Sequence, residues 1–298
     1  MPITRRTTLL AAAALPLAAP ALLRAGPAAA QGAPAALPFA PSQAFRIGAW
    51  GVSTLLAGSA PQENPQETFG LDVDAETFAA ASAEAFIPAD RGRGFFTPTL
   101  VDTGRERILF DTGLDAAGIT AALSHAGVAP GDVTHVVLTH MHPDHIGGLT
   151  DEAGQATFPD AAYVAGRAEF DHWAAQGSDG FEAKVRPFAE AMAFVEPDQE
   201  VIPGIAAVEA FGHTPGHLAF RVESGGQPLL IAGDMTNHPV WSLAHPDWEV
   251  RFDADKAAAA ATRRRLLGML AAERMPMIGY HLPFPALGFV EAAGDGFR

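Results

Sequence analysis

The most informative stretch of the chain reads Thr139-His140-Met141-His142-Pro143-Asp144-His145-Ile146-Gly147-Gly148. Three imidazoles and one carboxylate follow directly after the apolar run Val136-Val137-Leu138. Both groups are ligands that zinc and similar divalent metals accept. A strand that ends in this cluster presents the side chains together at the edge of a sheet, and the two-residue spacing of His140 and His142 suits extended or turn backbone, not a helix. We therefore interpret the stretch as a metal-binding loop. The alternative is a polar loop that contains three histidines.

Further candidate ligands downstream disfavour that alternative. His217 closes the turn Gly212–His217, while Asp234 follows the apolar run Leu229-Leu230-Ile231 and His281 follows Met277-Ile278. Spacing along the chain alone does not show that these positions meet in space.

The H-x-H-x-D-H box, the later Thr-Pro-Gly-His, the Gly-Asp pair and the final histidine resemble the metallo-β-lactamase-fold hydrolases. The resemblance runs from about Phe45 to the end of the chain. Within the superfamily, the chain is most similar to the branch of methyl parathion hydrolase-like enzymes and related lactonases. Residues 108–113, 212–217 and 279–285 also carry the likeness. The resemblance implies an α/β fold, the four-layer αβ/βα sandwich, with the metal site at one edge of its two sheets. Members often continue a little beyond the position of Arg298, which leaves the completeness of the C-terminus open.

The same resemblance implies two divalent metal ions. Zinc is the default, and manganese, iron or cobalt are feasible on nitrogen and oxygen ligands. The implied ligands are His140, His142 and His217 for the first ion, Asp144, His145 and His281 for the second, and Asp234 between them. His213 is not expected to bind metal, because the Thr-Pro-Gly-His pattern selects His217.

The resemblance also implies a reaction. A hydroxide between the two ions attacks a carbonyl carbon or a phosphorus. Asp144 is either a ligand only or also passes a proton to the leaving group. Asp111 is expected to orient a ligand histidine without binding metal.

We expect a substrate pocket with mostly apolar walls. The predicted pocket residues are Phe170, Trp173, Phe194, Asn237, Leu282 and Phe284. For the aromatic residues, packing in the core is the alternative. Asn237 stands three residues after the expected bridging aspartate, where many acyl-homoserine lactonases have tyrosine, so the chain departs there from the usual lactonase pattern.

The first thirty residues differ from the rest of the 298-residue chain. They contain no acidic residue, place Arg5-Arg6 before an apolar run and end in Ala28-Ala29-Ala30. This composition is typical of an export signal, and the arginine pair indicates the twin-arginine route. Pro16 and Pro20 keep the run below membrane-spanning length. We therefore predict a periplasmic or secreted protein.

The net charge and the absence of cysteine restrict the classes of binding partner and of metal ligand. Without residues 1–30 the chain has 16 basic and 34 acidic residues, a formal charge of −18, which repels nucleic acid and anionic membranes. There is no cysteine, so disulfides and thiolate ligands are excluded. We expect a small-molecule substrate and, by analogy with the branch, a homodimer.

The rest of the chain is expected to form one domain. Residues 31–44 are rich in alanine and proline and predict a disordered leader, and residues 45–298 predict the hydrolase domain. Strands are predicted at 45–56, 95–101, 107–110, 133–139, 161–165, 208–211, 218–222, 228–232 and 277–280, and helices at 116–127, 167–175, 181–194 and 255–272. This alternation suits sheets covered by helices. Residues 58–88 are irregular, and either a flap over the site or a plain surface loop fits them.

These observations together predict a dinuclear metal-dependent hydrolase of neutral apolar esters, lactones or phosphotriesters. The alternatives are an N-acyl-homoserine lactonase, a β-lactamase and a non-catalytic exported metal-binding protein. Lactamases usually lack the bridging aspartate or use cysteine, which disfavours the second. Glyoxalase-type thioesterases need basic residues for glutathione, and the chain has two lysines, Lys184 and Lys256. The complete set of candidate ligands disfavours the non-catalytic alternative, because a site that has lost its activity usually also loses a ligand.

Overall fold

The computed structural model describes residues 40–298, so the predicted export signal and residues 31–39 of the predicted leader lie outside the described residues. The remaining leader residues do not match the prediction. Ser42–Ile47 forms strand β1, which pairs antiparallel with β2 (Trp50–Leu55), and the single strand predicted over 45–56 is therefore a hairpin. Gly48 turns the chain with φ 53°, in the left-handed region that glycine adopts readily.

The first sheet has the strand order β1-β2-β5-β6-β7-β8-β9. Its other strands are β5 (Thr99–Asp102), β6 (Arg107–Phe110), β7 (His135–Val137), β8 (Ala162–Gly166) and β9 (Ala193–Val195). The strands from β6 to β9 are parallel. Helix α2 (Ala116–His125) connects β6 to β7, and α4 (Arg167–Gln176) and α5 (Asp179–Lys184) connect β8 to β9.

The helix predicted over residues 181–194 is wrong in its second half. Helix α5 ends at Lys184, a 3-10 turn covers Arg186–Phe188, and Ala193–Val195 is β9. Pro187 has no backbone N–H to donate, so it does not support a continuing α-helix.

The second sheet has the order β10-β11-β12-β13-β14-β15. Its strands are Glu200–Ile202, Ile205–Glu209, Leu218–Ser224, Gln227–Ile231, Pro276–Ile278 and Leu287–Phe289. All neighbours pair antiparallel except β13 and β14, which are parallel. Helix α6 (Lys256–Glu273) lies against the sheet, and its N-cap Asp255 accepts a hydrogen bond from Ala258 N.

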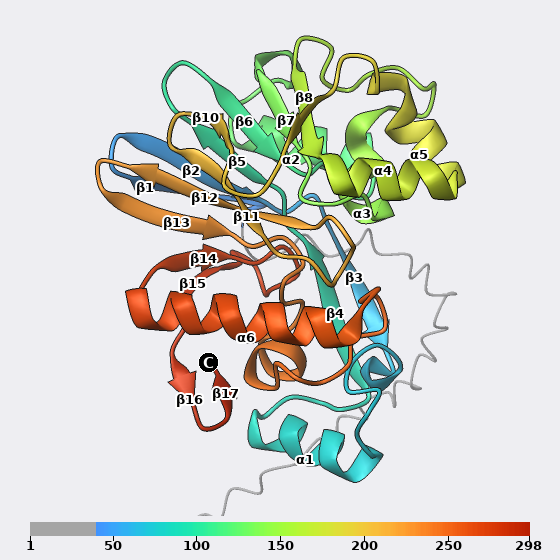
Figure 1. The fold of residues 1–298 in the computed structure, drawn as a ribbon, viewed down its shortest axis with the longest axis vertical. Coiled ribbons are helices and arrows are strands. Elements are labelled where there is room, and N and C mark those ends of the chain that lie inside the picture. Colours follow the sequence, from blue (N-terminus) through green and yellow to red (C-terminus); the bar gives the residue numbers. More distant parts are fainter. Residues whose placement is uncertain (1–39) are drawn as a thin grey trace, which may run out of the picture. The chain divides into compact units, whose positions relative to one another are not determined.

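Figure 1 shows the layers of the fold, and three apolar cores lie between them. One lies between the first sheet and its helices, with Leu109, Leu123 and Phe181. The next lies between the two sheets and includes Phe110 and Phe220, and the third includes Leu230, Leu266 and Leu270 under α6. The order helix, sheet, sheet, helix confirms the predicted αβ/βα sandwich.

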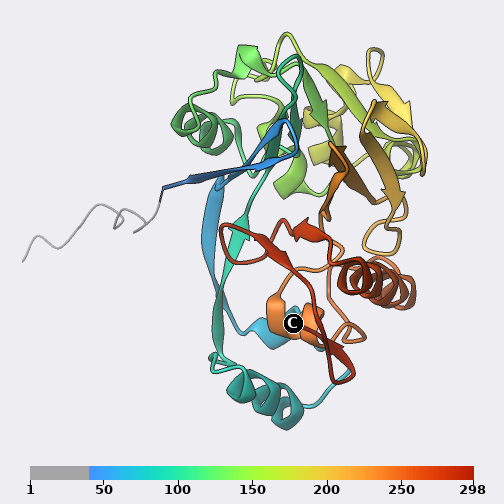
Figure 2. The ribbon, with the colours of Figure 1, turned by 90° about the vertical axis from the view of Figure 1, so that its left-hand side faces the viewer.

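Residues 58–88, for which a flap or a loop was expected, begin with a strand. β3 (Gly58–Glu63) pairs with β4 (Arg91–Phe96), and the ribbon runs out from the sheets to helix α1 (Ala75–Glu84), as Figure 2 shows. Phe78 of α1 stacks on Trp241 of the short π-helix η5 (Pro239–Ala244). The remaining short elements are η1 (Pro65–Glu67), η2 (Pro130–Asp132), α3 (Pro143–Ile146), η3 (Gly147–Leu149), β16 (Ala292–Ala293) and β17 (Gly296–Phe297). Within residues 40–298, no helix is both long and apolar enough to cross a membrane.

Candidate metal centre

The loop after β7 places its ligands by a change from extended backbone to helix. His142 is extended (φ −66°, ψ 153°), and Pro143 at the first position of α3 has the fixed φ that suits a helix start. Asp144 and His145 then lie on this short helix. The glycines that follow are required by packing, since a Cβ on Gly147 would lie 2.0 Å from Leu114 O.

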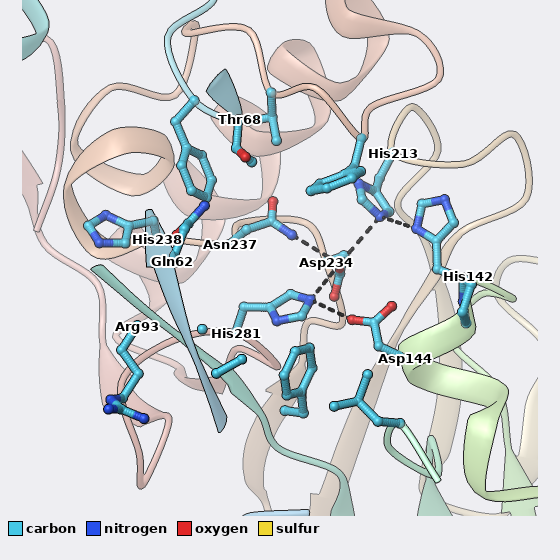
Figure 3. Close-up of a pocket in the computed structure, with 18 of the residues that line it drawn as sticks. Gln62, Thr68, Arg93, His142, Asp144, His213, Asp234, Asn237, His238 and His281 are labelled. Carbon is cyan, nitrogen blue, oxygen red and sulfur yellow. Dashed lines mark hydrogen bonds and ion pairs between the residues drawn. The ribbon is translucent and has the colours of Figure 1, made fainter. Parts of the chain in front are cut away.

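Histidines and aspartates from four separate loops converge beside this helix (Figure 3). Three groups have ligand atoms that all lie within 4.8 Å of one another. They are His140 with His142 and His213, His140 with His145 and Asp234, and Asp144 with His145 and His281. Six of the seven predicted ligands therefore meet in space.

Asp234 lies at the middle of this convergence. Its Oδ2 is 3.3 Å from His213 Nε2 and 3.0 Å from His281 Nε2, and its Oδ1 is 3.1 Å from His145 Nε2. Asn237, which was predicted to line the pocket, donates from Nδ2 to Asp234 Oδ2 at 3.0 Å. This arrangement suits a carboxylate shared between two binding positions.

The structure corrects the assignment of the third histidine. His217 donates from Nδ1 to Ala210 O (2.9 Å) and accepts at Nε2 from the Asp234 backbone N–H (3.1 Å). Both ring nitrogens of His217 therefore form hydrogen bonds with backbone atoms. His213, which was not expected, lies with its Nε2 2.9 Å from His142 Nδ1. His217 supports the loop from behind, and His213 faces the other candidate ligands.

A buried chain of charges holds His213. Its Nδ1 lies 3.0 Å from Asp253 Oδ1, and Asp253 Oδ2 accepts a hydrogen bond from Arg263 Nη1 at 2.8 Å. Arg263, from α6, is fully buried and also donates to Pro246 O and Trp248 O. Gly212 allows α6 to approach, because a Cβ there would lie 2.2 Å from Ala259 N. No sequence motif pointed to Asp253 or Arg263.

Asp111 lies against the first loop. Its Oδ2 is 2.9 Å from His145 Nδ1, and its two oxygens accept from the N–H and the hydroxyl of Thr139, each at 2.8 Å. Tyr280 packs its ring on His145 and donates to Asp144 O at 2.5 Å. Sequence analysis missed Tyr280, although it directly precedes His281. These contacts fix the ring of His145.

Glu169 joins the two loops that contribute most of the histidines. Its carboxylate accepts from Met141 N (2.9 Å) and Trp173 Nε1 (2.6 Å) on one oxygen, and from Thr214 Oγ1 (2.7 Å) and Gly216 N (3.0 Å) on the other. The side chain is buried. A carboxylate with four donors is fully satisfied, so Glu169 fixes the distance between the loops. It too carried no sequence signal.

Burial and neighbouring charges divide the histidines into two kinds. Burial and the neighbouring His213 lower the pKa of His142 to about 3, and burial holds the pKa of His140 well below its usual value. For His281, burial is outweighed by Asp234 and Asp144, which raise its pKa to about 10. Burial opposes ionisation of Asp144, yet His145 and His281 lower its pKa to about 2. Neutral imidazoles and ionised carboxylates are the forms that bind metals.

The unpaired atoms also fit divalent metals. His145 Nε2 and Asp234 Oδ1 are buried and lie 3.1 Å apart, but within residues 40–298 neither atom has a partner with the geometry of a hydrogen bond. His142 Nδ1 lies within 3.0 Å of two other imidazole nitrogens that likewise point inward. Buried acceptors without donors are costly unless a cation or water satisfies them. The donor set of nitrogen and oxygen atoms is the kind that zinc, manganese, iron and cobalt accept.

The cluster lies at one side of a cavity of about 450 Å³ with largely apolar walls. Pro61, Phe69, Phe96, Leu114 and Phe252 form much of these walls, and the ribbon of β3 and β4 contributes several of them. Part of the irregular segment therefore covers the site, as the flap alternative expected.

Of the six residues predicted to line the pocket, Asn237 alone does so. Phe170, Trp173 and Phe194 belong to the core between the first sheet and its helices, and Leu282 packs under the second sheet. Phe284 is partly buried outside the cavity. The prediction failed because the walls come from the ribbon and from the loop after Asp234, which have no regular spacing relative to the metal box.

Comparison with known proteins decides the family. The sequence profile of the Metallo-beta-lactamase superfamily matches residues 92–276. The chain belongs to this superfamily.

Among curated relatives, an N-acyl homoserine lactonase of Bacillus sp. is 30% identical over 117 residues, which cover 39% of this chain and 44% of the relative. The Homo sapiens metallo-beta-lactamase domain-containing protein 1 is 39% identical over 122 residues, which cover 39% of this chain and 43% of that protein. The chain thus matches less than half the length of each. A solved structure of AidC, a dizinc quorum-quenching lactonase in complex with a product, superposes with a TM-score of 0.79 at 24% identity, over 87% of this chain and 97% of that one. This likeness confirms the fold.

Proposed function

We propose that this protein is a dinuclear metal-dependent hydrolase that cleaves neutral lactones and esters with apolar chains. The observation that carries the proposal is the convergence of five histidines, His213 among them, and two aspartates beside a largely apolar cavity. The similarity to N-acyl homoserine lactonases makes a lactone the first substrate to test.

The candidate ligands fall into two groups, one for each metal position. His140, His142 and His213 would hold one divalent ion, Asp144, His145 and His281 the other, and Asp234 both. Two such ions supply a water of lowered pKa and polarise a carbonyl oxygen. Asp253 and Asp111 keep the rings of His213 and His145 in one orientation and tautomer, which is what outer partners of metal ligands do.

The chain's own groups account for proton transfer and substrate choice. Asp144 lines the cavity, and its Oδ2 faces His281 while its Oδ1 has no partner within the described residues. We infer that Oδ1 takes the proton of the attacking water and returns it to the departing alcohol oxygen. The apolar walls favour an uncharged chain next to the reacting ester.

The test is metal content of the purified protein by elemental analysis, combined with hydrolysis of γ-lactones, p-nitrophenyl esters, a phosphotriester and a cephalosporin. We expect about two metals per chain, preference for lactones, and loss of both metal and turnover in His142→Ala. Turnover of the cephalosporin alone would replace the proposal with a β-lactamase. Retained turnover after metal removal would overturn it.

Export and assembly are part of the proposal and rest on the sequence. Cell fractionation of the full chain, with Arg5-Arg6 changed to Lys-Lys as the control, tests twin-arginine export. Light scattering of the purified protein tests the homodimer. A cytoplasmic wild-type protein or a monomer would contradict the respective prediction.

A further inference from the structure

His238 has a hydrogen-bonding arrangement that fixes which of its ring nitrogens holds the proton. Nδ1 accepts from the backbone N–H groups of Val240 and Trp241, each at 3.2 Å, and so caps the start of η5. A nitrogen that accepts two hydrogen bonds is unprotonated. In a neutral ring the proton must then lie on Nε2, which makes Nε2 a donor.

The ring of His238 is also held in place. It stacks on Trp241 with ring centroids 3.8 Å apart and an interplanar angle of 12°. The ring centroid of Phe69 lies 5.6 Å from that of His238. Burial lowers the pKa of His238 to about 3, so the ring is neutral at physiological pH. The side chain therefore presents a fixed and uncharged N–H group.

This N–H group is available to a ligand. His238 lines the cavity, and in Figure 3 Asn237 lies between it and Asp234. Nε2 forms no hydrogen bond within residues 40–298 and does not belong to their buried atoms without a partner, so it reaches solvent. It is a donor on the wall of a largely apolar cavity, which Gln62, Thr68 and Arg93 also line.

We propose that His238 is a specificity-determining residue whose Nε2–H donates a hydrogen bond to an uncharged oxygen in the substrate's side chain. The inference rests on the proposed function and extends it from apolar chains to chains with a carbonyl oxygen beside His238. A carbonyl oxygen accepts a hydrogen bond from such an uncharged donor without bringing a further charge into the largely apolar cavity.

The test uses two γ-lactones of equal chain length, one with a ketone in the side chain and one with methylene at that position. The measured quantity is the ratio of their kcat/KM values. In His238→Asn the side-chain oxygen can still cap η5 but no donor reaches the Nε2 position, so we expect the ratio to fall about tenfold, mostly through KM for the ketone. His238→Gln reaches the Nε2 position and should retain part of the ratio.

His245→Asn is the matched control. His245 stacks on Trp248 with centroids 4.1 Å apart at 11°, ends η5 and does not line the cavity. Its variant should leave the ratio unchanged. Equal loss of kcat/KM on both lactones in His238→Asn, with an unchanged ratio, would show a structural role and overturn the proposal.

A binding measurement keeps the inference separate from the proposed function. If the wild-type protein hydrolyses neither lactone, the proposed function fails, and nitrogen-15 NMR of the metal-loaded wild-type protein decides on His238. We expect an Nε2-protonated ring whose Nε2–H resonance shifts with the ketone lactone and not with its methylene analogue. A ring protonated at Nδ1, or equal response to both lactones, would overturn the proposal.

Discussion

The loop Thr139–Gly148 and the loop Gly212–His217 both supply histidines to one site, but they do so in different ways. In the first, every histidine and the aspartate face the site. In the second, His213 faces the site while His217 forms hydrogen bonds with Ala210 and Asp234 backbone atoms. The closely spaced ligands of the first loop all face the site where the strand gives way to a short helix, whereas the direction of two histidines four residues apart depends on what packs around them.

Substituting His213 or His217, the two histidines of the second loop, should separate their roles by the largest difference in metal content and turnover. His213→Ala removes a ring from the metal positions, and we expect metal loss and a fall in turnover greater than the roughly 10–100-fold that loss of an outer partner costs. Elemental analysis and lactone hydrolysis measure both.

His217→Gln is the matched variant. It should keep about two metals and lower the free energy of unfolding by about 1–3 kcal/mol, because the Asp234 backbone N–H loses its acceptor. If His217→Gln loses the metals and His213→Ala keeps them, the comparison between the loops is wrong.

Asp253 and Asp111, which hold the rings of His213 and His145, should give the next largest effects. Asp253→Asn should weaken metal binding about 10–100-fold and also destabilise the fold by about 3–5 kcal/mol, since it leaves the buried Arg263 without its carboxylate. Asp111→Asn should weaken metal binding similarly without leaving an arginine unpaired. Competitive chelator titration and denaturant unfolding separate the two effects.

Asp247→Asn serves as the control for α6. It breaks the exposed ion pair with Arg264, which contributes about 0–1 kcal/mol. A destabilisation by Asp253→Asn no larger than this control would contradict the role of the buried pair.

The two kinds of histidine predict a pH dependence of the metal-free protein. His142 and His217, with pKa values lowered to about 3 and about 4, bind protons more readily when unfolded, so stability falls as pH drops below about 6.5. His281, with its pKa raised to about 10, contributes stability that is full below 6.5 and is lost as pH rises towards 10. Thermal unfolding from pH 4 to 10 should therefore show a maximum near pH 6.5, and a flat alkaline side would argue against the environment given for His281.

The smallest effects distinguish the cavity wall from the core. Phe252 is 53% exposed and lines the cavity, so Phe252→Ala should raise KM for long-chain lactones about three- to tenfold with little change in melting temperature. Phe170→Leu should instead cost about 1 kcal/mol of stability and leave KM unchanged. The opposite pattern would restore the pocket that the sequence predicted.

Several structural elements around the loop Thr139–Gly148 were predicted from residues close together in the sequence. The box after an apolar strand, the Asp111 turn and the helices 116–127 and 255–272 each depend on residues close together in the chain, and their counterparts appear in the structure. Strands β3 and β15 and the helix η5 were not predicted, because contacts outside each segment stabilise them: β3 pairs with β4, β15 pairs with β14, and Phe78 stacks on Trp241 of η5.

The residues of the sequence alone indicated the kinds of ligand, because imidazole and carboxylate at close spacing after a strand have few other uses, and the resemblance to the metallo-β-lactamase-fold hydrolases indicated the fold. That His213 faces the site and His217 does not became visible in the folded structure, since the choice depends on Asp253, on Arg263 from α6 and on the backbone around Asp234. The folded structure also sets the cavity walls, which come from the ribbon of β3 and β4 together with residues of other loops such as Phe69, Leu114 and Phe252. Contacts between residues far apart in the chain leave no spacing pattern, and these contacts set both the direction of a side chain and the shape of a pocket.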